Sequence, residues 1–354
     1  MQENKKRFLY IDCIKGVMIL FVLYYHIMWL GVKFKDSPTK EFFDLVCMQS
    51  FFFISGFVSY RQVIDCHFRD IVYDIRKKIV RLLLPTIVMF LFCCFYYKLD
   101  INYYVHNEFK SGYWFTYVLF LIFLLHSLVN YLVNKLSEKI RMKQTVADII
   151  LVIMGGCLYF AYDRIYGMLN NEFYKIFSLQ FVLKYYIFYV IGYIARKYEL
   201  LFEKFIVDNT FSIFVLLIVA SCPMLFAEID LSKKVIQLIV SLSQVIFVYI
   251  CFKKATCFQK ENRLSHHLAL MGKYSMSIYF LHYYFIFNIP YALQFISYEQ
   301  EASICFRGAG NYLLPEILVI LPVAIILAYF SIGIRKIVDY VPFLSNFLFG
   351  PSPK

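Results

Sequence analysis

The side chains that could do chemistry are the few ionisable groups inside long apolar stretches of this sequence. Placing such a group in hydrocarbon is costly, so each one indicates a functional site. They are His26, His126, Lys184, His282 and Glu316, with Asp12 and Lys15 near the start of the first stretch. A histidine in an apolar environment stays neutral and can accept a proton from a hydroxyl, so general-base chemistry is the first expectation.

The first apolar stretch places a cation and a histidine on one helical face. At 100° per residue, Lys15 and His26 differ by about 20° in angle and lie about 16 Å apart along a helix. This geometry suits a channel with a cation at its mouth and an imidazole deep inside. It excludes Asp12 as the carboxylate that orients His26, and Glu316 is the better candidate for that role.

A stripe of polar residues follows the ninth apolar stretch. Ser275, Tyr279 and His282 have i, i+4, i+7 spacing and therefore share one helical face. They either line the channel or form a hydrogen-bonded seam between helices. The helical rise places His282 and Lys184 at about the depth of His26, so we expect these groups to line one path in the outer half of the membrane.

A dense basic segment precedes the third apolar stretch. Four cations bracket one helical turn at the predicted membrane surface: Arg76, Lys77, Lys78 and Arg81. Pro85 follows them. Cations this close together can match several phosphate oxygens with charge-assisted hydrogen bonds, which favours a multiply phosphorylated ligand. The alternative is ordinary topogenic charge with a contribution from anionic lipid.

These groups require a bundle of membrane-spanning helices to position them. Of the 354 residues 61% are hydrophobic and 17% charged, and the charges gather between apolar runs of about 20 residues, the length that crosses hydrocarbon as a helix. Such runs predict an all-α, polytopic membrane protein and argue against a β-barrel. We take residues 1–340 as one membrane domain and 341–354 as a short cytosolic tail. The expected spans number about ten and cover approximately residues 9–31, 42–60, 79–97, 114–134, 146–162, 176–195, 211–227, 234–253, 268–289 and 312–334.

The distribution of Lys and Arg predicts the orientation of the bundle. An even number of spans puts both termini on one side, and most of the 36 Lys and Arg fall there, so the positive-inside rule makes that side cytosolic. The loop from about 98 to 113 is then extracytoplasmic. The same rule accounts for the net charge of +12 without a nucleic-acid partner. The ten cysteines lie mostly in apolar runs without metal-ligand or disulfide spacing, so we expect no metal site.

Several motifs, taken together, resemble the membrane acyltransferase-3 family. They occur in the order of that family across nearly the whole chain. The motifs are R-F-L-Y-I-D-C-I-K-G (7–16) followed by His26, F-F-F-I-S-G-F (51–57), R-L-L-L-P (81–85), Y-W-F (113–115), F-Y-V-I-G-Y around Gly192, and G-K-Y-S-M-S-I-Y-F-L-H (272–282). This sequence departs from the family pattern in carrying Lys15 in place of an arginine and in lacking a Y-x-x-I-E-x-P ending.

The resemblance implies an integral membrane enzyme that transfers an acyl group, usually acetyl from acetyl-CoA, to a hydroxyl of a cell-envelope carbohydrate. The family's first-span histidine corresponds to His26, the expected general base, and its basic residues to Lys78 and Arg81. We assign the whole basic segment, with Lys15, to the donor. Trp114 joins the channel-lining residues on the path of the acceptor. A covalent acyl-enzyme relay through Ser55 is the alternative mechanism, although Ser55 followed by Gly56 also suits close helix packing.

The expected partners are therefore acyl-CoA, a carbohydrate or lipid-linked glycan acceptor, and membrane lipids, with no permanently bound cofactor. The expected location is the bacterial cytoplasmic membrane. Rival functions remain: a different membrane O-acyltransferase fold with His282 as its buried histidine, a polysaccharide exporter or flippase that needs no acyl-CoA, and a sensor or scaffold. The sequence leaves open the acceptor sugar, acetyl against succinyl, and the oligomeric state.

Overall fold

The computed structural model describes residues 8–31, 38–60, 68–169, 172–225, 234–286 and 313–352, and within these ranges the chain forms helices and no strand. Seven helices in this part of the chain are long and apolar enough to cross a membrane, or eight if Glu199–Val207 and Thr210–Ser221, bent by 76°, form one broken span. The prediction of an all-α, polytopic membrane protein is therefore confirmed. The count of ten spans and the cytosolic termini stay predictions, and the terminal residues 1–7 and 353–354 lie outside the described ranges.

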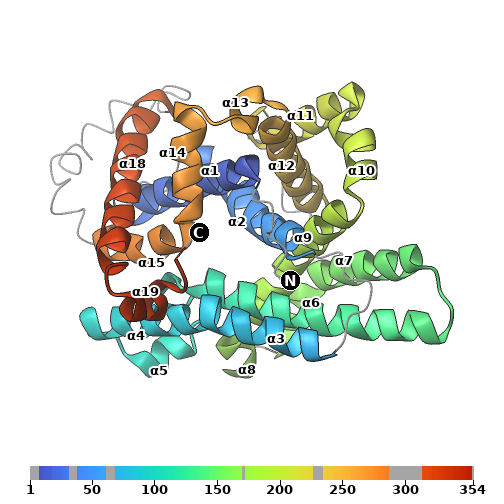
Figure 1. The fold of residues 1–354 in the computed structure, drawn as a ribbon, viewed down its shortest axis with the longest axis horizontal. Helices are drawn as coiled ribbons and strands as arrows, with labels where there is room; N and C mark the ends of the chain where they lie inside the picture. The colour runs from blue at the N-terminus through green and yellow to red at the C-terminus, as the bar shows by residue number, and fades with distance from the viewer. Residues whose placement is uncertain are drawn as a thin grey trace. The chain divides into compact units, whose positions relative to one another are not determined.

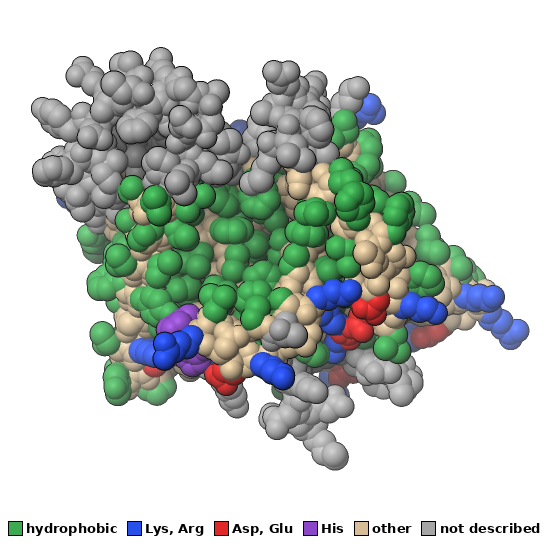
Figure 2. Space-filling view, turned by 90° about the horizontal axis from the view of Figure 1, so that it is seen from above, with side chains coloured by type: hydrophobic (Ala, Val, Ile, Leu, Met, Phe, Trp, Pro, Cys, Tyr) green, Lys and Arg blue, Asp and Glu red, His purple; other side chains and the backbone are tan. Residues whose placement is uncertain are grey.

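Large hydrophobic side chains are exposed along the long helices. Phe95 is 83% exposed, Phe211 74% and Ile326 65%. Figure 2 shows hydrophobic side chains over much of the visible helix surface, with Lys, Arg, Asp and Glu side chains gathered along one border of it. An apolar surface of this extent is unfavourable in water and suits contact with lipid chains.

The chain forms two compact units. Unit 1 comprises residues 1–48 and 205–340, unit 2 comprises residues 49–204 and 341–352, and the boundary falls within α2 (Pro38–Ser59). Besides the start of α2, unit 1 contains α1 (Leu9–His26), the π-helical turn η1 (Ile27–Gly31), α11 (Thr210–Leu225), α12 (Lys234–Lys254), α13 (Thr256–Gln259), α14 (Arg263–Lys273), α15 (Ser275–Ile286) and α18 (Leu313–Val338). Unit 2 contains the rest of α2, α3 (Phe68–Lys78), the π-helical turn η2 (Ile79–Leu83), α4 (Leu84–Tyr96), α5 (Ile101–Val105), the 3-10 turn η3 (Lys110–Gly112), α6 (Trp114–Lys139), α7 (Gln144–Leu169), α8 (Glu172–Ile176), α9 (Leu179–Lys197), α10 (Glu199–Phe202) and α19 (Pro342–Phe349). The π-helical turn η4 (Glu203–Val207) spans the boundary between Lys204 of unit 2 and Phe205 of unit 1.

In unit 1, α1 is the central helix. It is apolar on all sides and packs against α12, α14, α15 and α18 (Figure 1). The backbones of α1 and α14 touch at two glycines. A Cβ on Gly16 would lie 2.0 Å from the carbonyl oxygen of Leu268, and one on Gly272 would lie 1.8 Å from that of Asp12. Only residues without a side chain permit this crossing.

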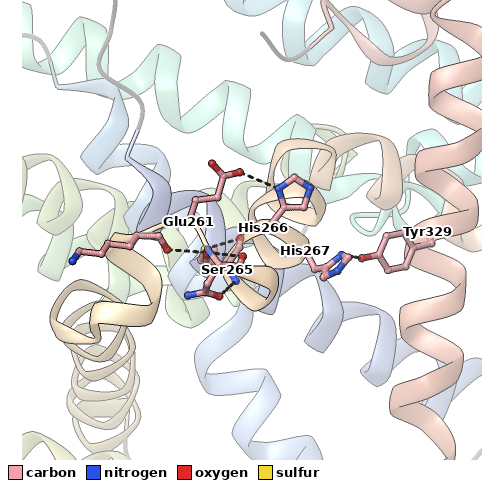
Figure 3. A network of polar contacts seen from close by, with 8 residues as sticks. Glu261, Ser265, His266, His267 and Tyr329 are labelled. Atoms are coloured by element: carbon pink, nitrogen blue, oxygen red, sulfur yellow. Dashed lines mark hydrogen bonds and ion pairs between the residues drawn. The ribbon is translucent and has the colours of Figure 1, made fainter.

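A hydrogen-bonded network at the start of α14 fixes this helix in unit 1 (Figure 3). Asn262 and Ser265 form a reciprocal capping box, because the Asn262 side chain accepts from the Ser265 backbone N–H at 2.9 Å and Ser265 Oγ accepts from the Asn262 N–H at 2.8 Å. His267 Nδ1 lies 2.5 Å from the hydroxyl of Tyr329 on α18, and Cys13 Sγ donates to the Ser265 carbonyl at 3.4 Å. The network therefore links α14 to α18 and to α1.

In unit 2, α9 is the central helix and repeats this construction. It packs against α6, α7 and α8. A Cβ on Gly192 of α9 would lie 1.9 Å from the Phe53 carbonyl oxygen, and one on Gly56 of α2 would lie 1.9 Å from that of Tyr189. The glycines of the F-F-F-I-S-G-F and V-I-G-Y motifs therefore meet each other's helices.

Three of the expected spans differ from the observed helices. The third is longer, because α3, η2 and α4 form one span from Arg69 to Tyr96. The sixth corresponds to α9, which is rich in tyrosine and is not among the helices apolar enough to count as a span. The ninth is divided at Tyr274 into α14 and α15, and α14 has a polar first turn. Residues 287–289 of that expected span lie outside the described ranges.

Candidate active site

His26 is the last residue of α1, where the helix widens into the π-helical turn η1. Such turns interrupt the regular hydrogen-bond ladder and are frequent at functional sites. The adjacent residues Ile27 and Met28 are fully buried, whereas His26 is half-buried. The end of α1 therefore holds the imidazole on rigid backbone and leaves part of the ring accessible.

His282 and Tyr283 of α15 contact both ring nitrogens of His26. His282 Nε2 lies 2.9 Å from His26 Nδ1, and the Tyr283 hydroxyl lies 3.3 Å from His26 Nε2. The two imidazole rings are stacked with centroids 4.9 Å apart. The other nitrogen of His282, Nδ1, lies 2.6 Å from the backbone carbonyl oxygen of Tyr279. All four residues belong to unit 1, and the His282 side chain is fully buried.

This chain of contacts fixes the proton positions on the neutral rings. A backbone carbonyl only accepts, so His282 Nδ1 carries a hydrogen and donates to Tyr279. The Nε2 of His282 must then accept, which requires His26 to donate from Nδ1. His26 Nε2 is left with a lone pair directed toward the Tyr283 hydroxyl, which donates to it. The atom of His26 that can take a proton from a substrate is therefore Nε2.

An imidazole held in this way has the geometry that general-base catalysis requires. A hydroxyl that takes the place of the Tyr283 O–H can pass its proton to His26 Nε2, and the bond from Nδ1–H to His282 strengthens as the ring becomes positive. The arrangement has the logic of a catalytic base oriented by a third group, with a second histidine in the place that a carboxylate takes in a Ser-His-Asp triad.

The remaining residues assigned to this region are placed as follows. Ser275 is the first residue of α15 and half-buried, and Tyr279 is buried with its ring 5.7 Å from that of His282. Lys15 lies 3.7 Å from the carboxylate of Asp12, its neighbour on α1. The side chain of Glu316 lies outside the described residues, so its assignment to His26 stays a prediction. Within the described part, His282 occupies the orienting position.

The basic segment lies in unit 2 and is helical throughout. Arg76, Lys77 and Lys78 form the last turn of α3, and Arg81 lies in the π-helical turn η2. Arg76, Lys77 and Arg81 are exposed, whereas the Nζ of Lys78 lies 4.9 Å from the ring centroid of Phe123. The segment therefore presents three accessible cations beside a local widening of the helix.

Helix α19, which falls in the expected C-terminal tail, packs against α4 in the same unit. Gly350 ends it at φ +74°, where a Cβ would lie 3.0 Å from the backbone oxygen of Arg81. The residues after α19 therefore support the backbone of the basic segment.

Lys184 and Trp114 share one aromatic cluster of unit 2. Trp114 packs at a tilt against Phe181, with ring centroids 4.4 Å apart, and stacks on Tyr185 at 5.7 Å. The Nζ of Lys184 lies 5.3 Å from the Tyr185 centroid. Both residues are half-buried. Ser55, the alternative nucleophile, is half-buried beside the crossing of α2 and α9, a position that also suits its role in close packing.

Two features of the site were not predicted from the sequence. Tyr283 was not singled out, although it follows His282 directly. His282 was expected on the same path as His26, but a direct hydrogen bond between the two rings was not predicted. A third buried histidine, His126 of α6, provides a contrast within unit 2. It lies 3.4 Å from the Tyr186 hydroxyl and among tyrosine rings. The described part of the chain thus holds a histidine pair in unit 1 and a histidine surrounded by tyrosines in unit 2.

Comparisons with known proteins agree with the motif analysis. The family model described as the acyltransferase domain of the acyltransferase-3 family matches residues 8–334, which is nearly the whole chain and includes both units' candidate residues. No similar protein was found among curated proteins, and none among solved structures. The chain therefore belongs to the membrane acyltransferase-3 family.

Proposed function

We propose that this protein transfers an acyl group, acetyl in the first instance, from acyl-CoA to a hydroxyl group of an envelope polysaccharide or its lipid-linked precursor at the cell membrane. Family membership supports acyl transfer in general. The observation that carries the specific proposal is the oriented lone pair of His26 Nε2, because an alcohol attacks a thioester poorly while it keeps its proton.

In the proposed reaction the acceptor hydroxyl displaces the Tyr283 O–H from His26 Nε2. His26 removes the hydroxyl proton as the oxygen attacks the thioester carbonyl carbon, and a new C–O bond forms. The C–S bond then breaks, and His26 returns its proton to the departing CoA sulfur. The ester and CoA–SH are the products, and the base is regenerated. The bond from His26 Nδ1–H to His282 stabilises the positive ring between the two proton transfers.

The basic segment is the proposed contact for the phosphates of the donor. Arg76, Lys77 and Arg81 are exposed and lie within two helical turns, so their donors can engage several phosphate oxygens. Asp70 and Asp74 on the same helix moderate the net charge of this surface, which favours a ligand with ordered phosphates over diffuse lipid attraction. The family membership allows other acyl donors, and a CoA thioester is the one that this charge pattern favours.

The test measures two products in membranes that carry the wild-type protein: CoA thiol released from labelled acetyl-CoA, and label incorporated into polysaccharide. His26→Gln keeps a polar side chain of similar size but cannot act as the base. It should lower both signals by about 10² to 10⁴, the loss typical of a missing general base. Expression and thermal stability should stay near those of the wild type.

His126→Gln is the matched control, because it alters a buried intramembrane histidine in the same way outside the pair. It should retain most of the activity, since loss of an interhelical hydrogen bond in a membrane costs only about 0.6 kcal/mol on average. Turnover by His26→Gln above a tenth of the wild-type rate would show that His26 is structural. A polysaccharide exporter, the second candidate, would release no CoA at all from wild-type membranes.

A further inference from the structure

A pocket of about 680 Å³ lies on unit 2, and none of the residues assigned so far lines it. It is lined by α5 and the turn that follows it, by Tyr166 near the end of α7, and by Glu172 and Lys175 of α8. We call it the outer-loop pocket, because the Lys and Arg distribution predicts that both segments are extracytoplasmic. Its volume lies within the range of about 300 to 1,000 Å³ that is usual for small-molecule sites.

Buried polar contacts join the two segments that line this pocket: α5 with the turn after it, and α8. The Nζ of Lys110, whose side chain is 9% exposed, donates to the backbone carbonyls of Val105, Asn107 and Lys175. Ser178 Oγ donates to the Glu108 carbonyl at 2.8 Å. These bonds join the turn after α5 to α8 and to the residues that follow it. The two segments that line the pocket are therefore held together by hydrogen bonds.

His106 also joins these two segments. Its Nδ1 lies 2.7 Å from the Asn102 carbonyl oxygen, and its Nε2 lies 3.2 Å from the carboxylate of Glu172. These contacts connect the residue that follows α5 to α8.

The pocket presents hydrogen-bonding groups that the described residues leave unused. One carboxylate oxygen of Glu108, Oε2, is buried and has no partner among the described residues. Asn107 uses its side-chain oxygen to accept from the Phe109 N–H at 2.9 Å, which leaves its amide N–H groups to donate toward the pocket. A carboxylate oxygen without a hydrogen-bond partner favours a ligand that supplies an O–H to Glu108.

Exposed aromatic rings stand beside these polar groups. Tyr103 is 61% exposed and Phe109 53%, and both line the pocket with Tyr166. Aromatic faces pack against the apolar C–H faces of sugar rings, while carboxylate and amide groups hydrogen-bond the hydroxyls. The lining of the pocket carries two carboxylates, Glu108 and Glu172, and one lysine, Lys175. This balance argues against a polyphosphate such as CoA and favours an uncharged polyhydroxylated ligand.

We propose that the outer-loop pocket binds sugar residues of the polysaccharide acceptor, an inference that rests on the proposed function. Tyr103 and Phe109 provide the stacking surface, and Glu108 and Asn107 receive and donate hydrogen bonds to ring hydroxyls. The pocket thereby selects the glycan that is modified, while the chemistry is carried by His26.

The test uses full-length protein in lipid nanodiscs and the envelope polysaccharide purified from cells that lack this protein, whose hydroxyls are unmodified. Binding is measured directly in the His26→Gln background and without acyl donor, so that the polysaccharide is not modified during the measurement. Tyr103→Ala should weaken binding of this polysaccharide at least tenfold, and Glu108→Gln, which keeps the shape of the side chain, should weaken it severalfold. In the active protein, Tyr103→Ala should raise the half-saturating acceptor concentration by a similar factor.

Phe173→Ala is the matched control, because Phe173 is also 61% exposed, lies on α8 and does not line the pocket. It should bind the polysaccharide like its parent. Equal binding by all variants would overturn the inference, as would an equal loss in Tyr103→Ala and Phe173→Ala, which would assign both aromatics to the membrane interface. Pocket-dependent binding in a wild-type protein that releases no CoA would support the glycan site and reject the acyl-transfer proposal.

Discussion

The sharpest prediction concerns His282, which sets the tautomer of His26. In the structure His26 Nδ1–H donates to His282 Nε2 at 2.9 Å, and this bond leaves Nε2 of His26 able to accept. His282→Phe keeps a ring of comparable size but removes the acceptor. The His26 ring is then better satisfied when its hydrogen is on Nε2, where it donates to the Tyr283 oxygen, and in that form it cannot act as the base.

The size of the effect follows from the cost of the active tautomer. With His282 absent, keeping the hydrogen on His26 Nδ1 leaves a donor without a partner at a cost of about 1 to 3 kcal/mol. At about 1.4 kcal/mol per tenfold change in population, the active form falls to between a fifth and less than a hundredth of the total. We therefore expect His282→Phe to lower turnover about 5- to 150-fold. This loss is smaller than that expected for His26→Gln, because the minor tautomer still reacts.

His282→Gln provides the internal comparison. The Gln side-chain oxygen can accept from His26 Nδ1–H, so the turnover of His282→Gln should lie within about tenfold of the wild-type rate. If the reaction required an imidazole at this position, His282→Gln would be as slow as His282→Phe. The assay is CoA release from labelled acetyl-CoA at saturating donor and acceptor, with thermal stability measured in parallel. Wild-type turnover by His282→Phe would refute the tautomer argument. Equal losses in His282→Phe and His282→Gln would show that His282 acts through the ring itself, as a proton carrier.

Three further predictions follow from the packing, the basic segment and the outer loop. Gly192→Ala places a Cβ 1.9 Å from the Phe53 carbonyl oxygen and should lower stability by about 1 to 3 kcal/mol or more, whereas Gly156→Ala, whose Cβ meets nothing within 4 Å, should be neutral or stabilising in the same thermal-melting assay. Arg81→Ala should chiefly raise the apparent KM for acyl-CoA. A change confined to the apparent KM for the acceptor would instead indicate that Arg81 contacts lipid. Burial lowers the pKa of Lys110 from 10.5 to about 8, so between pH 8 and 10.5 the unfolded state binds the additional proton and local stability of residues 98–113 should rise with pH. Hydrogen exchange of that segment should show this rise in the wild type and not in Lys110→Met.

Local patterns in the sequence were sufficient for the class of fold and for several site residues. The apolar runs predicted a polytopic helical membrane protein, because burial in hydrocarbon leaves the helix as the simplest way to satisfy each backbone group. The cost of an ionisable group in a membrane singled out His26 and His282 without any structure. Span boundaries were less well predicted. The ninth expected span is divided at Tyr274, where the backbone leaves helical geometry at φ −98° and ψ 12°, and a search for apolar runs does not register such a break.

Tertiary structure decided which side chains form hydrogen bonds with His26. His26 and His282 are separated by 256 positions, and their contact depends on the crossing of α1 and α14 at Gly16 and Gly272, which determines where α15 begins beside α1. Helical periodicity reports which face of a helix is polar but not which helix that face meets. The sequence therefore determined the membrane environment, the family and the presence of histidines inside apolar helices, whereas only the packed helices decided which nitrogen of His26 can accept a proton, because that depends on a neighbour distant in sequence.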